Sequence, residues 1–215
     1  MTERGRFITL EGSEGSGKTT AARHLATWLR ERGTPTVLTQ EPGGTPLGEE
    51  VRRIVLHMRG MSDDLDPRAD ALLYAAGRAQ HVARVIRPAL ERGEWVVCVR
   101  YTDSSLAYQG AGYGNDMVEL RRLQEFATGG LRPDLTVLID VPVEAGLERT
   151  RRRAEWNRFE DTEAVAFFEQ VRAAYLKLAE EEPDRIAVVD GSGSVEDADA
   201  AIRDVVASRL KLERG

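Results

Sequence analysis

Eight consecutive residues, Gly12-Ser13-Glu14-Gly15-Ser16-Gly17-Lys18-Thr19, match a pattern that binds nucleotide phosphates. In loops with the pattern G-x-x-x-x-G-K-[ST], backbone N–H groups point at phosphate oxygens, the lysine reaches the β- and γ-phosphates, and the hydroxyl binds Mg²⁺. The pattern therefore predicts that the chain binds a nucleoside triphosphate. The residues expected to bind it are Gly12, Ser13, Glu14, Gly15, Ser16, Gly17, Lys18, Thr19 and Thr20.

The segments on either side of this loop have the right character to position it. Residues 7–10 form a short apolar run with β-favouring side chains, which is typical of a buried parallel strand. After Thr19, apolar residues recur at helical spacing until Gly33, a natural end for a helix. The order strand, glycine loop, helix places a helix N-terminus against an anion.

The rest of the chain repeats this alternation of strand and helix. Apolar runs predict strands at residues 7–10, 36–39, 95–99, 135–141 and 186–190, with helical patterns between them. This order predicts an α/β fold of three layers, in which helices flank a five-stranded parallel sheet. Helix starts are expected at Asp66-Pro67, Asp116 and Ser194, and Pro88 should interrupt a helix. We expect residues 1–215 to form a single domain.

Composition narrows the classes of function. The 215 residues carry a net charge of −6, which argues against broad nucleic-acid binding because such binding needs a basic surface. The single cysteine, Cys98, lies in an apolar run and cannot form an internal disulfide, as in a reducing compartment. No apolar run approaches the length that spans a membrane. We therefore expect a cytoplasmic protein that binds neither nucleic acid nor membrane.

A second group of residues suits the recognition of a small phosphorylated acceptor. Sites in open α/β sheets form beyond the carboxyl ends of the strands, so residues 40–45, 100–110, those after Asp140, and 190–194 should converge. Residues 100–110 combine a guanidinium, hydroxyls, aromatic rings and an amide, which suit a sugar phosphate and a base edge. Tyr74 and Arg78 share one helix face. Taken alone, each segment also fits a polar loop, a turn or a core aromatic.

Taken together, these motifs resemble the bacterial thymidylate (dTMP) kinase family of P-loop nucleoside monophosphate kinases. The resemblance rests on the phosphate loop, on Glu41-Pro42-Gly43-Gly44-Thr45, and on the Arg-Tyr-x-x-Ser-x-x-Ala-Tyr-Gln-Gly segment from Arg100 to Gly110. It covers nearly the whole chain in order and spacing. It implies transfer of the γ-phosphoryl group of ATP to dTMP, giving dTDP and ADP, with Mg²⁺ and in a homodimer.

The resemblance also assigns roles to individual residues. Lys18 and Arg100 become catalytic cations, with Arg100 on the acceptor phosphate. Tyr74 is expected to stack on thymine, Arg78 and Gln109 to contact its edge, and Tyr108 to crowd the sugar 2′ position. The residues expected to bind dTMP are Glu14, Glu41, Arg52, Tyr74, Arg78, Arg100, Ser104, Tyr108 and Gln109.

Residues 149–160 resemble the short mobile lid of the family. In relatives with an acidic residue in the phosphate loop, here Glu14, the lid supplies the catalytic arginine. The candidates are Arg151, Arg152, Arg153 and Arg158. The first three also fit a solvated helix end favoured by the helix dipole. Glu160 joins Thr19 as a candidate metal ligand.

Three positions depart from the family pattern, and each loses a charge. Val99, Gln40 and Asn157 stand where the family has Asp, Arg and Asp. Val99 matters most, since that carboxylate helps to organise Mg²⁺ and a valine cannot accept a hydrogen bond from metal-bound water. The carboxylates that could compensate are Glu14, Glu41, Asp103 and Glu160. Two alternatives stay open: a weakly active or inactive nucleotide-binding protein with a regulatory role, or a kinase for another nucleoside monophosphate.

Overall fold

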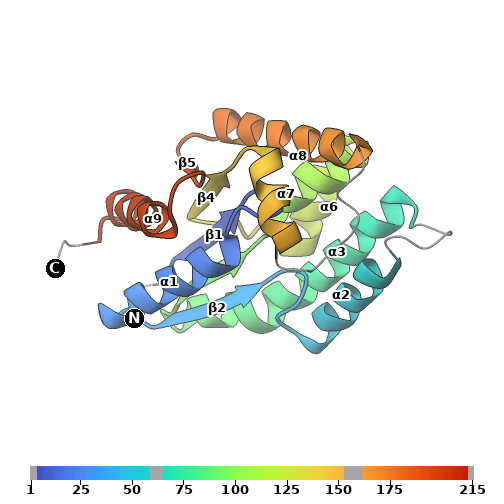
Figure 1. Cartoon of the computed structure of the whole chain (residues 1–215). Coiled ribbons are helices and arrows are strands. Elements are labelled where there is room, and N and C mark those ends of the chain that lie inside the picture. The colour runs from blue at the N-terminus through green and yellow to red at the C-terminus, as the bar shows by residue number, and fades with distance from the viewer. Residues whose placement is uncertain (1–3, 59–64, 153–161, 213–215) are drawn as a thin grey trace.

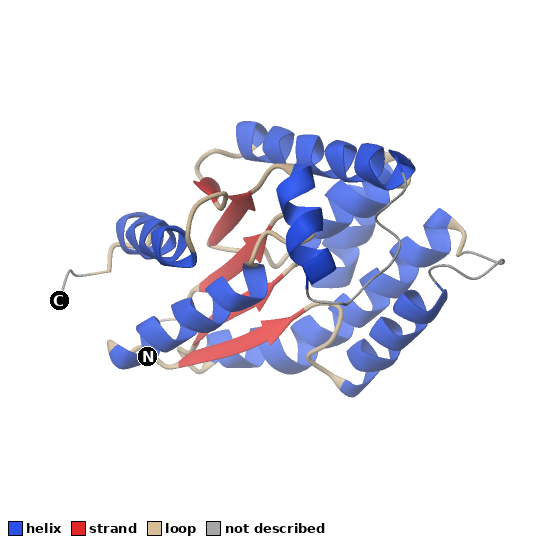
Figure 2. Ribbon diagram, viewed as in Figure 1, coloured by secondary structure: helices blue, strands red, loops and turns tan. Residues whose placement is uncertain are grey.

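The chain folds around one parallel β-sheet covered by helices on both faces (Figures 1 and 2). The computed structural model describes residues 4–58, 65–152 and 162–212. The strand order is β2-β3-β1-β4-β5, and every neighbouring pair is parallel. The predicted α/β class and five-stranded parallel sheet are confirmed. The strands are β1 (Phe7–Glu11), β2 (Thr36–Gln40), β3 (Trp95–Val99), β4 (Leu135–Asp140) and β5 (Ile186–Asp190).

Helices connect successive strands. The first half of the chain contains α1 (Lys18–Glu31), α2 (Pro46–Met58), α3 (Pro67–His81), the π-helical stretch η1 (Val82–Ile86) and α4 (Arg87–Glu91). The second half contains α5 (Thr102–Ser105), the π-helical stretch η2 (Leu106–Gly112), α6 (Met117–Thr128), α7 (Val143–Arg152), α8 (Thr162–Glu181) and α9 (Val195–Arg209).

Alternation of side chains along the strands places one hydrophobic cluster on one face of the sheet and two on the other. In β3, Val97 and Val99 pack with α1 and α9, whereas Val96 and Cys98 pack with η1 and α4. The apolar positions of α1 predicted from helical spacing, such as Leu25 and Leu29, lie in the first cluster. Strands buried on both faces explain why the sequence shows continuous apolar runs.

The predicted helix signals act where expected. The Asp66 side chain accepts a hydrogen bond from Arg68 N, that of Asp116 accepts from two backbone N–H groups, and Ser194 Oγ accepts from Asp197 N. Pro88 has no N–H to donate, and the widened turn η1 lies directly before α4, which contains it. Three strand ends were off by one residue: β1 ends at Glu11 and β2 at Gln40, each one residue later than predicted, and β4 ends at Asp140 rather than at residue 141.

The topology determines where a site can form. The chain leaves β1 through the phosphate loop and α1 and then passes over β3 to form the edge strand β2. Leu10 of β1 pairs with Val99 of β3, so the segments that follow these two strands begin side by side. This is the crevice in which open α/β sheets bind ligands.

Candidate active site

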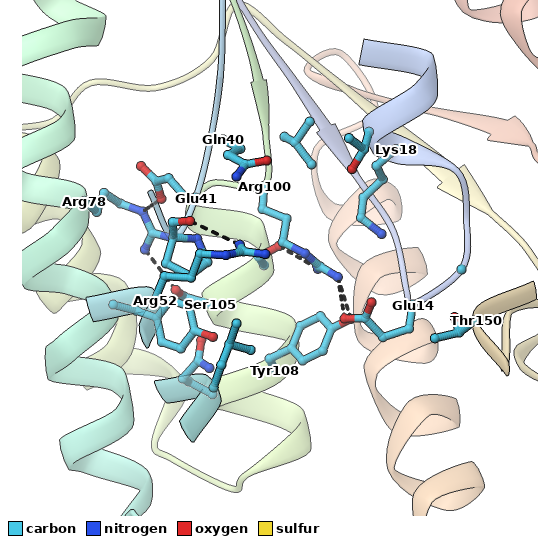
Figure 3. A pocket seen from close by; sticks show the side chains of 18 of the residues that line it. Glu14, Lys18, Gln40, Glu41, Arg52, Arg78, Arg100, Ser105, Tyr108 and Thr150 are labelled. Atoms are coloured by element: carbon cyan, nitrogen blue, oxygen red, sulfur yellow. Dashed lines mark hydrogen bonds and ion pairs between the residues drawn. The ribbon is translucent and has the colours of Figure 1, made fainter. Parts of the chain in front are cut away.

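One cavity of about 510 Å³ opens at the carboxyl ends of β1, β2 and β3 (Figure 3). It connects the phosphate loop with side chains from α2, α3, α5 and η2, and its volume suits a nucleotide-sized ligand. Asp190–Ser194 was expected to converge here, but these residues do not line the cavity. Instead, Arg149 of α7 donates to the carbonyl of Gly191 over 2.9 Å. The lining residues are Glu14, Gly15, Gly17, Lys18, Thr19, Thr20, Gln40, Glu41, Pro42, Arg52, Leu56, Tyr74, Arg78, Val99, Arg100, Ser104, Ser105, Tyr108, Gln109 and Thr150.

The phosphate loop owes its shape to glycines that no other residue could replace. Gly15 has φ +70°, and a Cβ there would lie 1.9 Å from the backbone oxygen of Gly146 in α7. Gly12 has φ +143°, and its Cβ would meet the carbonyl oxygen of Ile139 at 2.5 Å. The loop therefore packs against β4 and α7 as bare backbone, which keeps it compact below the cavity.

Lys18 begins α1 and turns back onto its own loop. Its Nζ donates to the carbonyl of Ser13 over 2.6 Å and to Ser16 Oγ over 3.1 Å, and the residue is buried. Burial, together with the positive charge of Arg100, lowers the pKa of Lys18 to about 7, against the opposing effect of Glu14 and Glu11. A bound triphosphate would favour the charged form of this amine.

Arg100 crosses the floor of the cavity and connects its two halves. Its backbone lies in the left-handed region with φ +66°, an uncommon conformation for a residue other than glycine. One guanidinium nitrogen donates to Glu14 Oε1 over 2.8 Å and to Tyr108 OH over 3.1 Å. The guanidinium carbon also lies 4.8 Å from the centroid of the Tyr108 ring. This strained, anchored geometry directs a fixed cation into the crevice.

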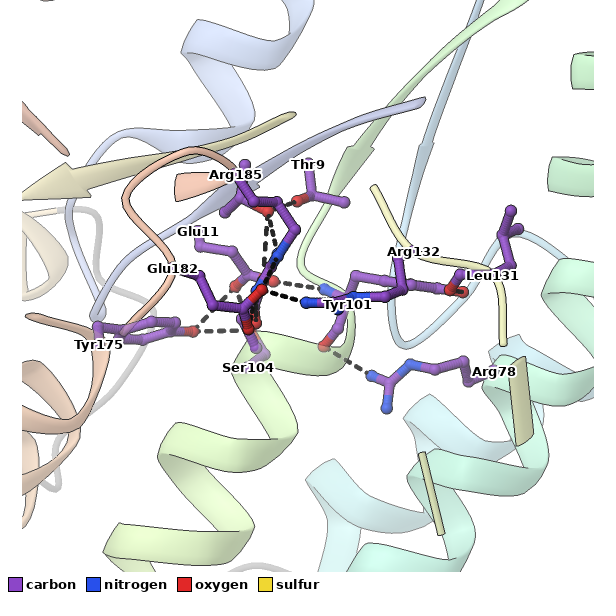
Figure 4. A network of polar contacts seen from close by, with 12 residues as sticks. Thr9, Glu11, Arg78, Tyr101, Ser104, Leu131, Arg132, Tyr175, Glu182 and Arg185 are labelled. Carbon is purple, nitrogen blue, oxygen red and sulfur yellow. Dashed lines mark hydrogen bonds and ion pairs between the residues drawn. The ribbon is translucent and has the colours of Figure 1, made fainter. Parts of the chain in front are cut away.

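Glu11, the last residue of β1, lies at the centre of a buried hydrogen-bond network with Tyr101, Ser104 and Tyr175 (Figure 4). Its carboxylate accepts hydrogen bonds from Tyr101 N over 2.7 Å, Ser104 Oγ over 2.6 Å and Tyr175 OH over 3.0 Å. Arg100 donates in turn to Ser104 Oγ and to Tyr175 OH. Burial, with the negative charge of Asp103, raises the pKa of Glu11. The Glu11 carboxylate therefore holds Tyr101, the residue after Arg100. It also holds Ser104 and Tyr175, two hydrogen-bond partners of the Arg100 guanidinium.

A second buried network, centred on Arg78, forms another wall of the cavity. Arg78, which is 2% exposed, donates to Glu41 Oε2 over 2.7 Å, to Ser105 Oγ over 2.9 Å and to the Tyr101 carbonyl over 2.9 Å. It also donates to Gln124. The other oxygen of Glu41 contacts His81 Nδ1 at 2.9 Å. Arg78 thus lines the cavity while its guanidinium is already held by protein groups.

The other predicted acceptor residues lie around the same wall. Gln109 is buried on η2 and donates through Nε2 to Asp70 Oδ2 over 2.8 Å. Tyr74 of α3 and Arg52 of α2 both line the cavity, and Arg52 donates to the Pro42 carbonyl over 3.3 Å. The structure therefore brings every residue predicted to bind dTMP to one cavity.

The predicted metal and lid residues are only partly described. Thr19 is exposed in the first turn of α1 and lines the cavity beside Glu14. Among residues 4–58, 65–152 and 162–212, no group of three or more His, Cys, Asp or Glu side chains could hold a metal. Arg151 and Arg152 end α7, are exposed and do not line the cavity. Arg153, Asn157, Arg158 and Glu160 lie outside the described residues.

Two of the carboxylates considered as substitutes for the charge missing at Val99 are engaged elsewhere. Asp103 pairs with Arg185 over 2.7 and 2.8 Å and does not line the cavity. Glu41 is held by Arg78 and His81. Glu14 remains as the described carboxylate closest in sequence to the phosphate-binding groups, and it faces Arg100.

Comparison with known proteins identifies the family. The family model for thymidylate kinase matches residues 10–202. The chain belongs to the thymidylate kinase family. It is 48% identical over 213 residues to the thymidylate kinase of Pseudomonas syringae pv. tomato, covering 98% of this chain and 99% of that one. It is 50% identical over 206 residues to the Pseudomonas putida thymidylate kinase, covering 94% and 97% of the two chains. The Desulfovibrio desulfuricans thymidylate kinase is 49% identical over 213 residues, with 95% and 96% covered.

Family membership agrees with the arrangement of donor and acceptor groups around one cavity. The phosphate loop and the wall around Arg78 both line that cavity. In the described part of the chain, no helix is long and apolar enough to cross a membrane.

Several residues that organise the site were not predicted from the sequence. Glu11, Asp70 and Tyr175 are buried polar residues that hold Arg100, Gln109 and their partners. A signal existed for Glu11, because it is a charged residue directly after an apolar strand, at the carboxyl end where sites form. Asp70 and Tyr175 sit within helical patterns, and their partners are 39 and 164 residues away in sequence, so no local signal marks them.

Proposed function

We propose that this protein transfers the γ-phosphoryl group of ATP to dTMP, giving ADP and dTDP for the biosynthesis of dTTP. The observation that carries the proposal is that one cavity joins a phosphate-binding loop to a pocket wall of aromatic, amide and guanidinium groups. The first part suits a triphosphate and the second a pyrimidine nucleotide.

On the donor side, the protein binds and positions the triphosphate. The backbone N–H groups of residues 12–19 and the Lys18 amine surround the β- and γ-phosphates. Phosphoryl transfer requires in-line positioning and cations around the developing charge. An oxygen of the acceptor phosphate bonds to the γ-phosphorus as the bond to the bridging β–γ oxygen breaks, so ADP leaves with that oxygen.

On the acceptor side, Arg100 holds the dTMP phosphate, Tyr74 stacks on the base and Tyr108 crowds the 2′ position of the sugar. Arg78 and Gln109 face the base edge, and Glu14, Glu41, Arg52 and Ser104 complete the pocket. An arginine of residues 149–160 adds a further cation when the lid closes, with Arg151, Arg152, Arg153 and Arg158 as the candidates. A closed lid also excludes water, which would otherwise compete as the phosphoryl acceptor.

Mg²⁺ fits the donor set that the chain offers. Proteins commonly bind this ion through one or two side chains together with substrate phosphates, so the Thr19 hydroxyl is a sufficient protein anchor, with Glu160 as a second candidate. When bound, the ion would neutralise charge on the transferring phosphates.

We further propose a homodimer formed through α3 and α6. Leu72 of α3 is 57% exposed, and Val118 and Phe126 of α6 are 57% and 87% exposed. These two helices pack against each other, and large exposed apolar side chains mark interaction surfaces. Light scattering coupled to size exclusion should give a dimer mass for the wild type and a monomer mass for Phe126→Asp. A monomeric wild type would contradict this.

The proposed reaction is tested by measuring ADP release with ATP, Mg²⁺ and a panel of dTMP, dUMP, UMP, CMP and AMP. Turnover with dTMP, and more weakly with dUMP, supports the proposal. Binding of ATP and dTMP without turnover would identify a nucleotide-binding homologue instead. Preference for another acceptor would identify a different nucleoside monophosphate kinase.

A further inference from the structure

The amide of Gln109 is held by a single buried carboxylate. Gln109 is 2% exposed and Asp70 is 4% exposed, and Gln109 Nε2 donates to Asp70 Oδ2 over 2.8 Å. The backbone around Gln109 is fixed as well, because Asn115 donates to its carbonyl through Nδ2 over 2.7 Å. Gln109 lies on the π-helical stretch η2, a conformation frequent at functional sites.

This contact determines which end of the amide the cavity meets. A glutamine amide offers a donor NH₂ and an acceptor oxygen, whereas a carboxylate only accepts. Asp70 therefore binds the NH₂ end. Gln109 also lines the cavity. With one hydrogen of the NH₂ group bound to Asp70, the acceptor oxygen Oε1 is the end of the amide that Asp70 does not engage, and we take it as the end that meets a ligand. An asparagine at position 70 would fill the same space but could bind either end of the amide.

We propose that Asp70 is a positioning residue that sets the choice of acceptor base through Gln109. The N3 position of thymine and uracil carries a proton that Oε1 can accept, whereas N3 of cytosine is itself an acceptor and would face Oε1 without a donor. Asp70 thereby favours thymine and uracil and disfavours cytosine. This inference rests on the proposed function and deepens it.

The size of the effect follows from the cost of an unmatched polar group. Leaving a buried acceptor without a donor costs enough to change a rate ratio by about 10-fold to 100-fold. In Asp70→Asn the amide of Gln109 can turn over, so the penalty against cytosine is relieved while the fit to thymine weakens.

The test compares kcat/KM for dTMP with kcat/KM for dCMP, both with ATP and Mg²⁺. The ratio should fall by about tenfold or more in Asp70→Asn. The control Asp103→Asn also neutralises a buried carboxylate, but one bound to Arg185 away from the cavity, so its ratio should not change.

A second variant keeps the test decisive if Asp70→Asn folds poorly. Gln109→Leu removes the amide, so the ratio should fall, and the double variant should show no further fall because Asp70 acts through Gln109. Additive losses in the double variant, or an unchanged ratio in a folded Asp70→Asn protein, would overturn this inference and leave the proposed function standing. A wild type without dTMP turnover would reject the proposed function, and the inference with it.

Discussion

The proposed donor and acceptor ends of the cavity are built in different ways. The donor end is one continuous loop of backbone, residues 12–19, shaped by glycines that pack directly against β4 and α7. The acceptor end is a set of side chains from β2, α2, α3, β3, α5 and η2, held by buried networks around Glu11, Glu41 and Asp70. At the acceptor end, Arg78 is already hydrogen-bonded to Glu41, whereas Lys18 at the donor end folds back onto the Ser13 carbonyl of its own loop.

The two ends therefore achieve selectivity by different means. Every triphosphate presents the same phosphates, and backbone N–H groups and one amine are enough to bind them. One base differs from another by single donors and acceptors, so its pocket must fix the direction of each hydrogen bond before the ligand arrives. Rigid, buried side chains keep those hydrogen-bonding groups in fixed directions.

The largest expected effect comes from removing the donor-side cation. In Lys18→Met, kcat should fall by about 10³-fold, because a charge at the developing transition state is lost. Lys177→Met, on the exposed face of α8, is the matched control and should leave kcat unchanged. A comparable loss in both variants, or in neither, would mean that Lys18 does not act on the transferring phosphates.

Next in size is a change confined to the acceptor end. Arg100→Lys keeps the charge but loses the fork that contacts Glu14, Tyr108 and Ser104. The value of kcat/KM for dTMP should fall by about 10²-fold, whereas KM for ATP should change by less than about twofold. If kcat/KM for dTMP and KM for ATP change by similar factors, the two ends of the cavity do not act separately.

A smaller effect, and a gain, is expected at the position that lacks a charge. Val99 lines the cavity at the end of β3, and Val99→Asp should raise activity by about tenfold and lower the Mg²⁺ requirement. Val99→Asn is the control, since asparagine has nearly the size of aspartate but carries no charge. If Val99→Asp leaves both activity and Mg²⁺ dependence unchanged, the missing carboxylate has no role in this protein.

The smallest effect is a change in protonation when ATP binds. The pKa of Lys18 is lowered from 10.5 to about 7, so at pH 8 the amine of the free protein is mostly neutral. Triphosphate raises that pKa again, so binding at pH 8 should take up about one proton, and binding at pH 6 almost none. Calorimetry in buffers of different ionisation enthalpy measures this uptake. It should be absent in Lys18→Met, and an equal uptake in that variant would assign the proton to another group.

The difference between the two ends of the cavity also determines how much of the site could be predicted from the sequence. The donor loop is local, so its residues and the strand and helix around it were visible as one pattern, and the sheet followed from the apolar runs. The acceptor residues were each weak signals, and only their joint resemblance to a family assigned them. Glu41 and Arg78 were named as ligand contacts, yet their ion pair spans 37 residues and is set by tertiary packing. Asp70 and Tyr175 could not be found for the same reason.

We propose that the side chains at the acceptor end already have their final positions before nucleotides bind, whereas Lys18 moves when ATP binds. A crystal structure of the protein with dTMP and a non-hydrolysable ATP analogue tests this directly. The Arg78–Glu41 and Gln109–Asp70 hydrogen bonds should keep their present lengths of 2.7 and 2.8 Å, while Lys18 Nζ leaves the Ser13 carbonyl for the phosphates. If these two hydrogen bonds are broken in the complex and Lys18 Nζ still donates to the Ser13 carbonyl, the proposal is wrong.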